Sequence, residues 1–474
     1  MKTSNLPDIH TDFAQWYQEV VYRAQLADQS PVRGCMVIRP YGYAIWEEIQ
    51  TVLDKKIKET GHQNAYFPLL IPESFLNKEA EHVKGFAPEV AVVTHAGGKE
   101  LEEPLVIRPT SETIIHSMFA RWITSWRDLP LKINQWANVV RWEMRTRPFL
   151  RTTEFLWQEG HTAHETYEEA HAEMILMFEH YVDLAENYLA IPVITGRKPD
   201  SEKFAGADIT MTLEGIMQDG KALQMCTSHM ISQNFARAFN ISFQNRNGEL
   251  AHPYLTSWGA TTRLIGALIM THGDAKGLIL PPRIAPIQVV IIPILKADSQ
   301  EKVCAYAQEL ADVLKKAGVR VHLDLDDQKT PGAKFYEWEL KGVPLRIEVG
   351  PRDLEQKQVV IVSRLTGKKE VILGDTLERI ISQKIKEEQD ALFARARDYR
   401  NKLWFKREKL SEFTQDLETK GGFYQTGWCG DETCEEKVKA AKGTIRCLLP
   451  EKEFAHCFSC QKSSINDIII AKSY

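Results

Sequence analysis

The chain has 474 residues, a length that corresponds to about three domains and easily buries a sizeable core. Its 43% hydrophobic and 26% charged residues exclude a largely disordered chain, a collagen and a small disulfide scaffold. The formal net charge of −5 excludes a broad basic field, so any nucleic acid must bind at a local patch. No apolar run approaches the ~20 residues of a membrane span and the N-terminus lacks an apolar signal core, so we expect a cytoplasmic protein with no membrane partner.

The first part of the chain combines helical periodicity with strands of the antiparallel type. Ile45, Ile49 and Ile57 recur at helical spacing, and Gly61 ends that helix. This order of elements is typical of an α+β domain. The expected elements are helices at 43–60, 111–126 and 167–190 and strands at 65–67, 104–108, 136–143 and 153–159.

A proline-rich segment at 280–286 separates this part from a region in which strands and helices alternate. The alternation predicts an α/β domain with a largely parallel sheet. A long charged helix over 376–410 then leads to a cysteine-rich C-terminus. The expected elements of the second region are strands at 289–294, 320–325, 344–349, 358–364 and 369–373 and helices at 299–317 and 333–341.

Five of the eight cysteines are crowded into the C-terminal part. Two close pairs, Cys429 with Cys434 and Cys457 with Cys460, are separated by 22 residues and can surround one tetrahedral zinc ion. The alternative is a set of small buried hydrophobic residues. Cys447 and His456 are spare, and we expect each to be a packing or surface residue rather than a ligand. Four thiolate ligands leave no open position, so the expected ion is structural rather than catalytic.

An arginine-rich segment between two expected strands indicates an anion site. Alternation places Arg141 and Glu143 on one face of strand 136–143, and the loop MRTRPFLR is strongly basic. An inward arginine offers a bidentate donor set to a buried phosphate. The alternative, a solvated antiparallel hairpin, is disfavoured by the Trp, Phe and Glu side chains that crowd the second strand.

Two further segments carry weaker signals. Arg263 precedes the apolar run LIGALIM, so its half-buried charge needs an anion, although most such arginines pair with a carboxylate. In Arg108-Pro-Thr110-Ser-Glu112 a turn leads into a helix, and the alternative to a binding role is that Thr110 or Ser111 simply caps this helix.

In chain order, these segments resemble the three motifs of class II aminoacyl-tRNA synthetases: a helix and strand ending at Pro68, then RWE and FLWQE, then a late arginine on a glycine-led helix. The segments RPTSE, FLWQEGH, CTSH, SWGATTR and KGVPLRIEVGPRD are more specific and resemble the prolyl-tRNA synthetase family of the archaeal and eukaryotic-like type. The resemblance covers essentially the whole chain. It implies a multidomain α+β and α/β fold, with an antiparallel-sheet class II catalytic domain at 1–282, an α/β anticodon-binding domain at 286–385 and a small α/β zinc-binding domain at 400–474.

The resemblance implies an ATP-dependent ligase that works in two steps. The carboxylate of L-proline attacks the α-phosphorus of ATP to give prolyl-adenylate and pyrophosphate, and the terminal ribose hydroxyl of tRNA(Pro) then attacks the acyl carbon. Neither step needs an enzyme nucleophile, so catalysis would rest on positioning and charge stabilisation. Mg²⁺ is expected to bridge the phosphates.

The family also implies roles for individual residues. Arg141 would bridge the α-phosphate and the proline carboxylate, while Arg151 and Arg263 would hold the outer phosphates. Arg141 and Arg263 are therefore the expected catalytic residues. The residues expected around proline are Thr110, Glu112, Arg141, Trp157, Glu159 and His229. Those expected around ATP are Phe86, Arg141, Glu143, Arg151, Thr152, Gln224, Thr227, Thr261 and Arg263.

Three more expectations concern partners and the chain end. Glu339 and Arg346 are candidates for contacting guanine bases of the anticodon, with an ordinary surface ion pair as the alternative. Residues 43–68 would lie at the interface of a homodimer. Tyr474 would dock toward the active site rather than fray, which is the usual state of a terminus.

Other classes of protein fit the sequence less well. A threonyl or glycyl synthetase would use the same scaffold, but the TSE and TSH segments are proline-like. A non-catalytic paralogue would typically lose the ATP arginines, all of which are present. A zinc-dependent nucleic-acid-binding protein would explain residues 429–460 and nothing before them.

The spacing of the motifs leaves too few residues for an editing domain. Arg263 lies only 104 positions after Glu159, and helix 167–190 and the strands around 191–250 are needed to complete the catalytic sheet. A four-thiolate zinc has no position for an activated water. We therefore expect that the chain does not hydrolyse mischarged alanyl-tRNA(Pro) in cis.

Overall fold

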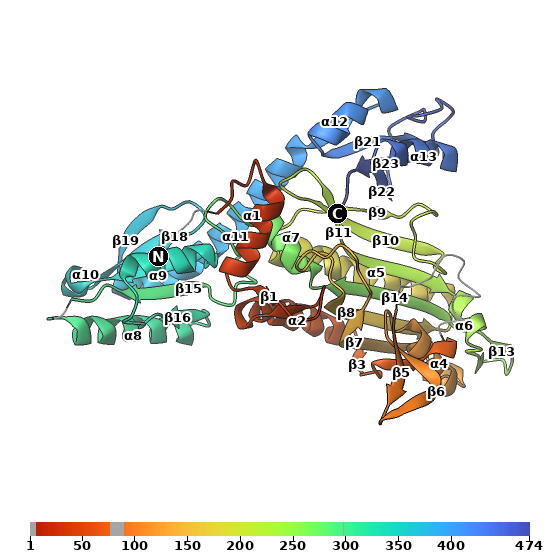
Figure 1. The fold of residues 1–474 in the computed structure, drawn as a ribbon, viewed down its shortest axis with the longest axis horizontal. Helices are drawn as coiled ribbons and strands as arrows, with labels where there is room; N and C mark the ends of the chain where they lie inside the picture. Colours follow the sequence, from red (N-terminus) through yellow and green to blue (C-terminus); the bar gives the residue numbers. More distant parts are fainter. Residues whose placement is uncertain (1–5, 76–89, 297) are drawn as a thin grey trace.

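The computed structural model describes residues 6–75, 90–296 and 298–474. Figure 1 shows a large sheet with the C-terminal segment extending it at one end, and a smaller α/β unit beside it. Helices α1, α7 and α11 lie where these parts meet. The fold is therefore organised around two sheets.

The larger sheet has 11 strands and forms the spine of the molecule. Every neighbouring pair from β7 to β9 runs antiparallel, as the α+β pattern predicts. In their order across the sheet, the strands are β20 (Trp404–Lys406), β21 (Phe423–Trp428), β23 (Asn466–Ala471), β22 (Thr444–Leu448), β9 (Ile194–Arg197), β10 (Ile209–Ile216), β11 (Ala222–Ser232), β14 (Tyr254–Thr261), β8 (Glu154–His164), β7 (Leu131–Val140) and β3 (Gln63–Asn64).

One face of this sheet is covered by helices that share a single buried core with it, in which Trp16, Trp46 and Leu268 are almost completely buried. The side chain of Gln158 in β8 points toward these helices, and its amide lies 2.6 Å from the hydroxyl oxygen of Tyr181. Because successive side chains alternate along a strand, the neighbours of Gln158 point to the opposite face. The covering helices are α1 (Phe13–Arg23), α2 (Pro40–Glu59), α5 (Tyr167–Asp183) and α7 (Arg263–His272).

The smaller sheet has five strands and is mixed, so the prediction of a largely parallel sheet is wrong. The two pairs made by β15 are parallel, whereas β17–β18 and β18–β19 are antiparallel. The connections explain this difference, because helices of 17 and 10 residues join the parallel strands, whereas a helix of only six residues joins β17 to β18 and a short turn joins β18 to β19. The elements are β15 (Val289–Pro293), α8 (Gln300–Lys316), β16 (Val321–Leu323), α9 (Pro331–Leu340), β17 (Leu345–Val349), α10 (Pro351–Gln356), β18 (Gln358–Ser363) and β19 (Lys369–Leu373).

Several predicted boundaries are displaced. Strand β7 ends at Val140, so the prediction that Arg141 and Glu143 share a strand face is wrong: both lie in the loop beyond it. Helix α11 (Leu377–Lys402) is shorter than the expected 376–410, because the next residues form β20 and pair in parallel with β21. The remaining elements include β1 (Ala27–Gln29), β2 (Met36–Ile38), β4 (Leu70–Pro72), β5 (Ala91–Ala96), β6 (Lys99–Ile107), α4 (Glu112–Trp122), α6 (Asn234–Ala238), β12 (Phe243–Gln244), β13 (Leu250–Ala251), α12 (Thr414–Thr419) and α13 (Glu432–Ala440).

The C-terminal segment continues the 11-stranded sheet instead of forming a separate layer. Strand β22 meets β9 where Leu448 pairs with Arg197. A Cβ atom at Gly196 would lie 2.5 Å from the carbonyl oxygen of Leu448 and 2.7 Å from the Cβ of Cys447, so only glycine allows this close approach. Cys447 is completely buried beside this seam, so of the two expected roles it has the packing one and not the surface one.

The smaller unit is fixed to the larger one just beyond helix α7. Arg364 donates two hydrogen bonds, at 2.7 and 2.9 Å, to the carboxylate of Asp274. The backbone amide of Leu278 also donates to the carbonyl oxygen of Leu340 at 3.0 Å. A bidentate pair and backbone hydrogen bonds together define the relative orientation of the two sheets.

Buried neutral histidines make the folded state sensitive to acid. Burial, helped by Arg395, lowers the pKa of His272 to about 3, and burial lowers the pKa of His164 to about 4. Between these values and the ordinary value near 6.5, the unfolded chain binds more protons than the folded chain. The free energy of unfolding should therefore fall as the pH falls from about 7 to about 4.

We predict that His272→Gln makes this pH dependence shallower, because glutamine can keep a donor near the Leu189 carbonyl oxygen, now 2.8 Å from His272 Nε2, without titrating. Urea unfolding followed by tryptophan fluorescence at pH 7.5 and 5.5 measures the slope. His10→Gln, at an exposed position, is the control and should leave the slope unchanged. Equal slopes in the wild type and His272→Gln would contradict the prediction.

Candidate active site

A cavity of about 540 Å³ opens on the sheet face opposite the covering helices, over β8, β11 and β14. It brings together all the residues predicted around proline and ATP, except Phe86, which lies outside the described residues. The predicted residues that line it are Thr110, Glu112, Arg141, Glu143, Arg151, Thr152, Trp157, Glu159, Gln224, Thr227, His229, Thr261 and Arg263.

Arg141 follows the end of β7, and its side chain is held by a hydrogen bond from Nε and by contacts of the guanidinium group with two aromatic rings. Its Nε donates to the carbonyl oxygen of Pro109 at 2.9 Å, and its guanidinium carbon lies 5.6 Å from the ring centres of both Phe155 and Trp157. Within the described residues, no protein acceptor is bound to its two terminal amino groups. This arrangement leaves a fixed, charged donor pair facing the cavity, which suits an anion.

Arg263 begins helix α7 and is held by backbone oxygens. Its Nε donates to Leu150 O at 3.3 Å and its Nη1 to Gln224 O at 3.2 Å. The alternative of a carboxylate partner is therefore wrong for the part of the chain that the structure describes. Burial, followed by the charges of Arg141 and Arg151, lowers the pKa of Arg263 to about 10. Like charges thus crowd the cavity and favour a polyanion there.

The cavity also contains a buried carboxylate network. Glu159 accepts hydrogen bonds from Ser111 Oγ at 2.5 Å and Gln135 Nε2 at 2.7 Å, and lies 3.0 Å from His161 Nε2. Burial by itself lowers the pKa of His161, but the hydrogen bond and charge of Glu159 raise it above the ordinary value overall. Glu112, 5% exposed, lies on the same side of the cavity. The cavity therefore offers both signs of charge.

The start of helix α4 is used for this network and not for capping. Thr110 Oγ1 donates to the carboxylate of Glu112, and Ser111, although it is the N-cap residue, makes no side-chain capping bond. The alternative that Thr110 or Ser111 simply caps the helix is therefore wrong. Both hydroxyl groups instead fix acidic side chains that line or border the cavity.

A β-bulge aligns the β11 residues with the cavity. Thr210 and Glu214 of β10 lie opposite His229 and Gln224, and the register shifts between Leu213 and Glu214. Strict alternation would put the odd-numbered His229 and the even-numbered Gln224 on opposite faces, but the bulge brings them to the same one. Burial lowers the pKa of His229 to about 3, so this ring is neutral at physiological pH.

Several further residues line the cavity and were not predicted from the sequence. Phe155 and His161 lie on the same face of β8 as Trp157 and Glu159, because these four positions are two residues apart. A period of two applied along FLWQEGH would therefore have found them. Others, on segments distant in sequence, carried no local signal. The remaining missed lining residues are Phe149, Leu150, Lys198, Glu202, Phe204, Thr210, Met225, Cys226, Ser257, Trp258 and Gly259.

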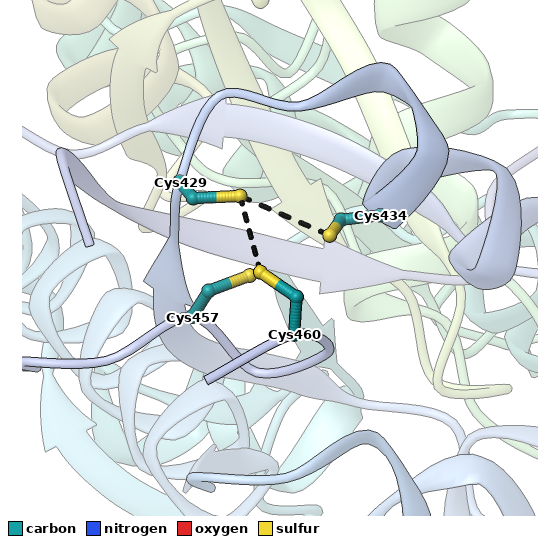
Figure 2. Close-up of side chains that lie close together, drawn as sticks. All are labelled: Cys429, Cys434, Cys457 and Cys460. Carbon is teal, nitrogen blue, oxygen red and sulfur yellow. Dashed lines mark hydrogen bonds between the residues drawn. The ribbon is translucent and has the colours of Figure 1, made fainter. Parts of the chain in front are cut away.

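The four paired cysteines come together outside this cavity. Figure 2 shows their sulfur atoms pointing toward one another from the two ends of the cysteine-rich region. The Cys429 sulfur lies 3.8 Å from that of Cys434 and 3.6 Å from that of Cys460, and all four sulfurs lie within 4.8 Å of one another. A Zn–S distance of about 2.3 Å implies sulfur separations of about 3.8 Å in a tetrahedron, so the cluster fits a zinc ion.

Each anticodon candidate forms an ordinary ion pair, as the alternative expects, but not with the other candidate. Glu339 accepts from Lys276 Nζ at 2.8 Å, whereas Arg346 donates to Glu348 at 2.9 Å and lies over the ring of Phe335. Both candidates nevertheless line one small hollow on the smaller unit. They are therefore close together but held by different partners.

Tyr474 is docked, as expected. Its backbone amide donates to Ala222 O at 3.1 Å and its hydroxyl donates to Asp219 at 2.7 Å. Lys221 Nζ and the guanidinium of Arg147 lie 5.0 and 5.7 Å from its ring centre. Because Arg147 belongs to the arginine-rich loop, the chain end contacts a segment that also borders the cavity.

Comparisons with known proteins agree with this fold and site. The class II tRNA synthetase core domain (G, H, P, S and T) matches residues 93–272, and the anticodon binding domain matches 288–384. The chain is therefore a class II aminoacyl-tRNA synthetase. The prolyl-tRNA synthetase C-terminal domain matches residues 410–474.

The proline–tRNA ligase of Alkaliphilus oremlandii is 54% identical over 469 residues, covering 98% of this chain and 97% of that protein. Accordingly, the chain belongs to the prolyl-tRNA synthetase family, which consists of ATP-dependent ligases. Two crystal structures of prolyl-tRNA synthetase from Cryptosporidium parvum, one with halofuginone and AMPPNP and one with L-proline and AMP, have TM-scores of 0.94 and 0.92. They are 42% and 41% identical to this chain, and each comparison covers 99% of both chains. Among the described residues, no helix is long and apolar enough to cross a membrane.

Proposed function

We propose that the cavity activates L-proline with ATP as prolyl-adenylate, releases pyrophosphate and then transfers proline to the 3′ end of tRNA(Pro). The observation that carries this proposal is the meeting of unpaired arginine donors and buried carboxylates in one cavity. Attack on the α-phosphorus passes through a state with charge spread over phosphate oxygens, which fixed guanidinium groups stabilise. The solved relative with L-proline and AMP supports the same pair of ligands.

Arg141 is proposed to bridge the α-phosphate and the proline carboxylate, because its free donor pair faces the cavity between two aromatic rings. Arg151 and Arg263 would hold the outer phosphates, as the like-charge crowding around Arg263 favours a polyanion. Mg²⁺ bound to the phosphates would share this neutralising role when ATP is present. The other proposed ATP contacts are Glu143, Thr152, Gln224, Thr227 and Thr261.

The proposed proline site lies at the carboxylate network. Glu112 can accept both N–H bonds of the secondary ammonium, and Trp157 offers a flat wall to the pyrrolidine ring. His229, neutral at physiological pH, adds no competing positive charge beside that ammonium. Thr110 and Glu159 complete the proposed site: Thr110 donates to the carboxylate of Glu112, and Glu159 is itself held by Ser111 and Gln135.

We predict that proline, and no other amino acid to a comparable degree, supports exchange of pyrophosphate into ATP. The secondary ammonium and the ring each need the groups just named, so primary amines of other shapes should be poor substrates. Exchange measured across all twenty amino acids tests this directly. Stronger exchange with threonine or glycine would overturn the assignment of the site.

A structural zinc ion is proposed at Cys429, Cys434, Cys457 and Cys460. Bound zinc would hold the loop after β21 to the segment before β23 through four thiolates and leave no open position for catalysis. The ion would therefore stabilise the C-terminal region without taking part in amino-acid activation.

We predict one zinc ion per chain by elemental analysis of protein purified without chelator. Cys434→Ser should lose the ion and make residues 400–474 more sensitive to limited proteolysis than the catalytic core, because binding energy at such sites is folding energy. Cys447→Ser, which removes a buried thiol outside the cluster, is the control and should retain zinc. A wild-type protein without stoichiometric zinc would contradict this prediction.

Domain limits of 1–282, 286–385 and 400–474 are proposed, supported by the three family matches.

We also propose a homodimer through residues 43–68, supported by the exposed rings of Tyr43 and Tyr66 in this segment. Sedimentation equilibrium tests the dimer, and a monomer at micromolar concentration would contradict it.

Glu339 and Arg346 are proposed to contact anticodon bases of tRNA(Pro), since both line one hollow on the smaller unit. Arg346→Ala should lower aminoacylation and spare pyrophosphate exchange, which needs no tRNA. Equal effects on both reactions would contradict the proposed contact.

The proposed enzyme has no editing site of its own. The 103 residues between Glu159 and Arg263 contain α5 and the strands β9, β10, β11 and β14, all of which belong to the catalytic core. We predict that preformed alanyl-tRNA(Pro) loses its alanine no faster with the purified enzyme than without it. Hydrolysis well above that rate, surviving extensive purification, would contradict the prediction.

A further inference from the structure

One buried arginine of the C-terminal region contacts the catalytic sheet directly. Arg446 lies on β22 and is 6% exposed. Its Nε and Nη2 donate to Glu214 Oε2 at 3.0 and 2.9 Å, and Nη2 also lies 3.2 Å from Oε1. Glu214 lies on β10 and is completely buried. This bidentate pair therefore joins the segment that carries the cysteine cluster to the sheet that carries the cavity.

Glu214 is a shared acceptor in this buried group. Lys198 Nζ lies 3.1 Å and Thr212 Oγ1 2.9 Å from its Oε1, and Lys198 also lines the cavity. Arg446 Nη1 donates to Thr444 Oγ1 at 2.9 Å. Both carboxylate oxygens are thus satisfied from two sides, which fixes the side chain of Glu214 in the interior.

The backbone of Glu214 connects this pair to the ATP end of the cavity. Glu214 lies opposite Gln224, immediately beside the β-bulge. The carbonyl oxygen of Gln224 accepts a hydrogen bond from Arg263 Nη1 at 3.2 Å, and the Gln224 side chain lines the cavity. A bulge interrupts the regular ladder, so a side-chain anchor at this point determines where the neighbouring carbonyl group lies.

The charge of Glu214 also acts on Arg263. The negative charge of Glu214 raises the pKa of Arg263, while burial, Arg141, Arg151 and Arg446 lower it. Glu214 therefore partly compensates the crowded positive charge without occupying the donors that face the cavity. The position of Glu214 therefore affects both the charge around Arg263 and the position of the Gln224 backbone.

We propose that Arg446 is a positioning residue for amino-acid activation: by holding Glu214 at the bulge, it sets the positions of Gln224 and Arg263 for ATP. This inference rests on the proposed ATP roles of Gln224 and Arg263. It assigns to the C-terminal region a contribution to the ATP site that acts through the sheet and is independent of the cysteine cluster.

The test is pyrophosphate exchange by the full chain carrying Arg446→Met. Glu214 keeps Lys198 and Thr212 as partners in this variant, so folding is expected to survive. We expect the KM for ATP to rise roughly tenfold, as small misplacements of binding groups are costly, with the KM for proline changed less than twofold. Zinc content and melting temperature should remain near those of the wild type.

Two further variants separate positioning from general damage. Arg446→Lys keeps a charge but loses the bidentate geometry, so we expect a smaller rise in the KM for ATP with the same selectivity; it decides the question if Arg446→Met does not fold. Lys442→Met is the matched control, because Lys442 pairs with Glu418 at an exposed position of the same region. It should leave both KM values unchanged.

An unchanged KM for ATP in folded variants at position 446 would overturn the positioning role alone. A parallel rise in both KM values with loss of zinc would also overturn it, since that pattern indicates a merely structural residue. A wild-type chain without proline-dependent exchange would instead overturn the proposed function, and this inference with it.

Discussion

The structure depends on one electrostatic constraint: Arg141 and Arg263 are held around a single cavity by groups that do not neutralise them. Arg141 is fixed by a carbonyl oxygen and two aromatic rings, and Arg263 by two carbonyl oxygens. Carboxylate partners at these donors would have produced an ordinary buried ion network. With backbone and aromatic partners, the positive charge stays available to a ligand with several negative charges.

This arrangement needs a rigid support, because like charges repel one another in a partly buried site. The antiparallel sheet supplies it: one face packs against helices around Trp16 and Trp46, and the other carries the cavity. Strand β22 then extends the same sheet, so the C-terminal region is part of the support instead of an appended module. The Arg446–Glu214 pair places a negative charge of this support near Arg263, where it partly offsets the neighbouring positive charges.

Sequence reasoning found most of the site because its signals were local. The FLWQEGH segment carried part of the family resemblance, which placed Trp157 and Glu159 in the site, and the paired cysteine spacing predicted the cluster. It could not find the bulge beside Glu214, because a register shift is a property of two paired strands. The contact of Arg446 with Glu214, 232 residues away, was equally invisible. The error over Arg141 and Glu143 arose because β7 ends at Val140, and no residue there marks the end of a strand.

The central claim is that the guanidinium of Arg141, whose terminal amino groups bind no protein acceptor among the described residues, stabilises the transferring phosphate. The most direct measurement is proline-dependent pyrophosphate exchange by Arg141→Ala, with circular dichroism and melting temperature recorded on the same preparation. Arg145→Ala, in the same loop but outside the cavity lining, is the matched control. The account predicts a loss of roughly 100-fold or more in exchange for a folded Arg141→Ala and little change for the control. Near-normal exchange by folded Arg141→Ala would contradict it.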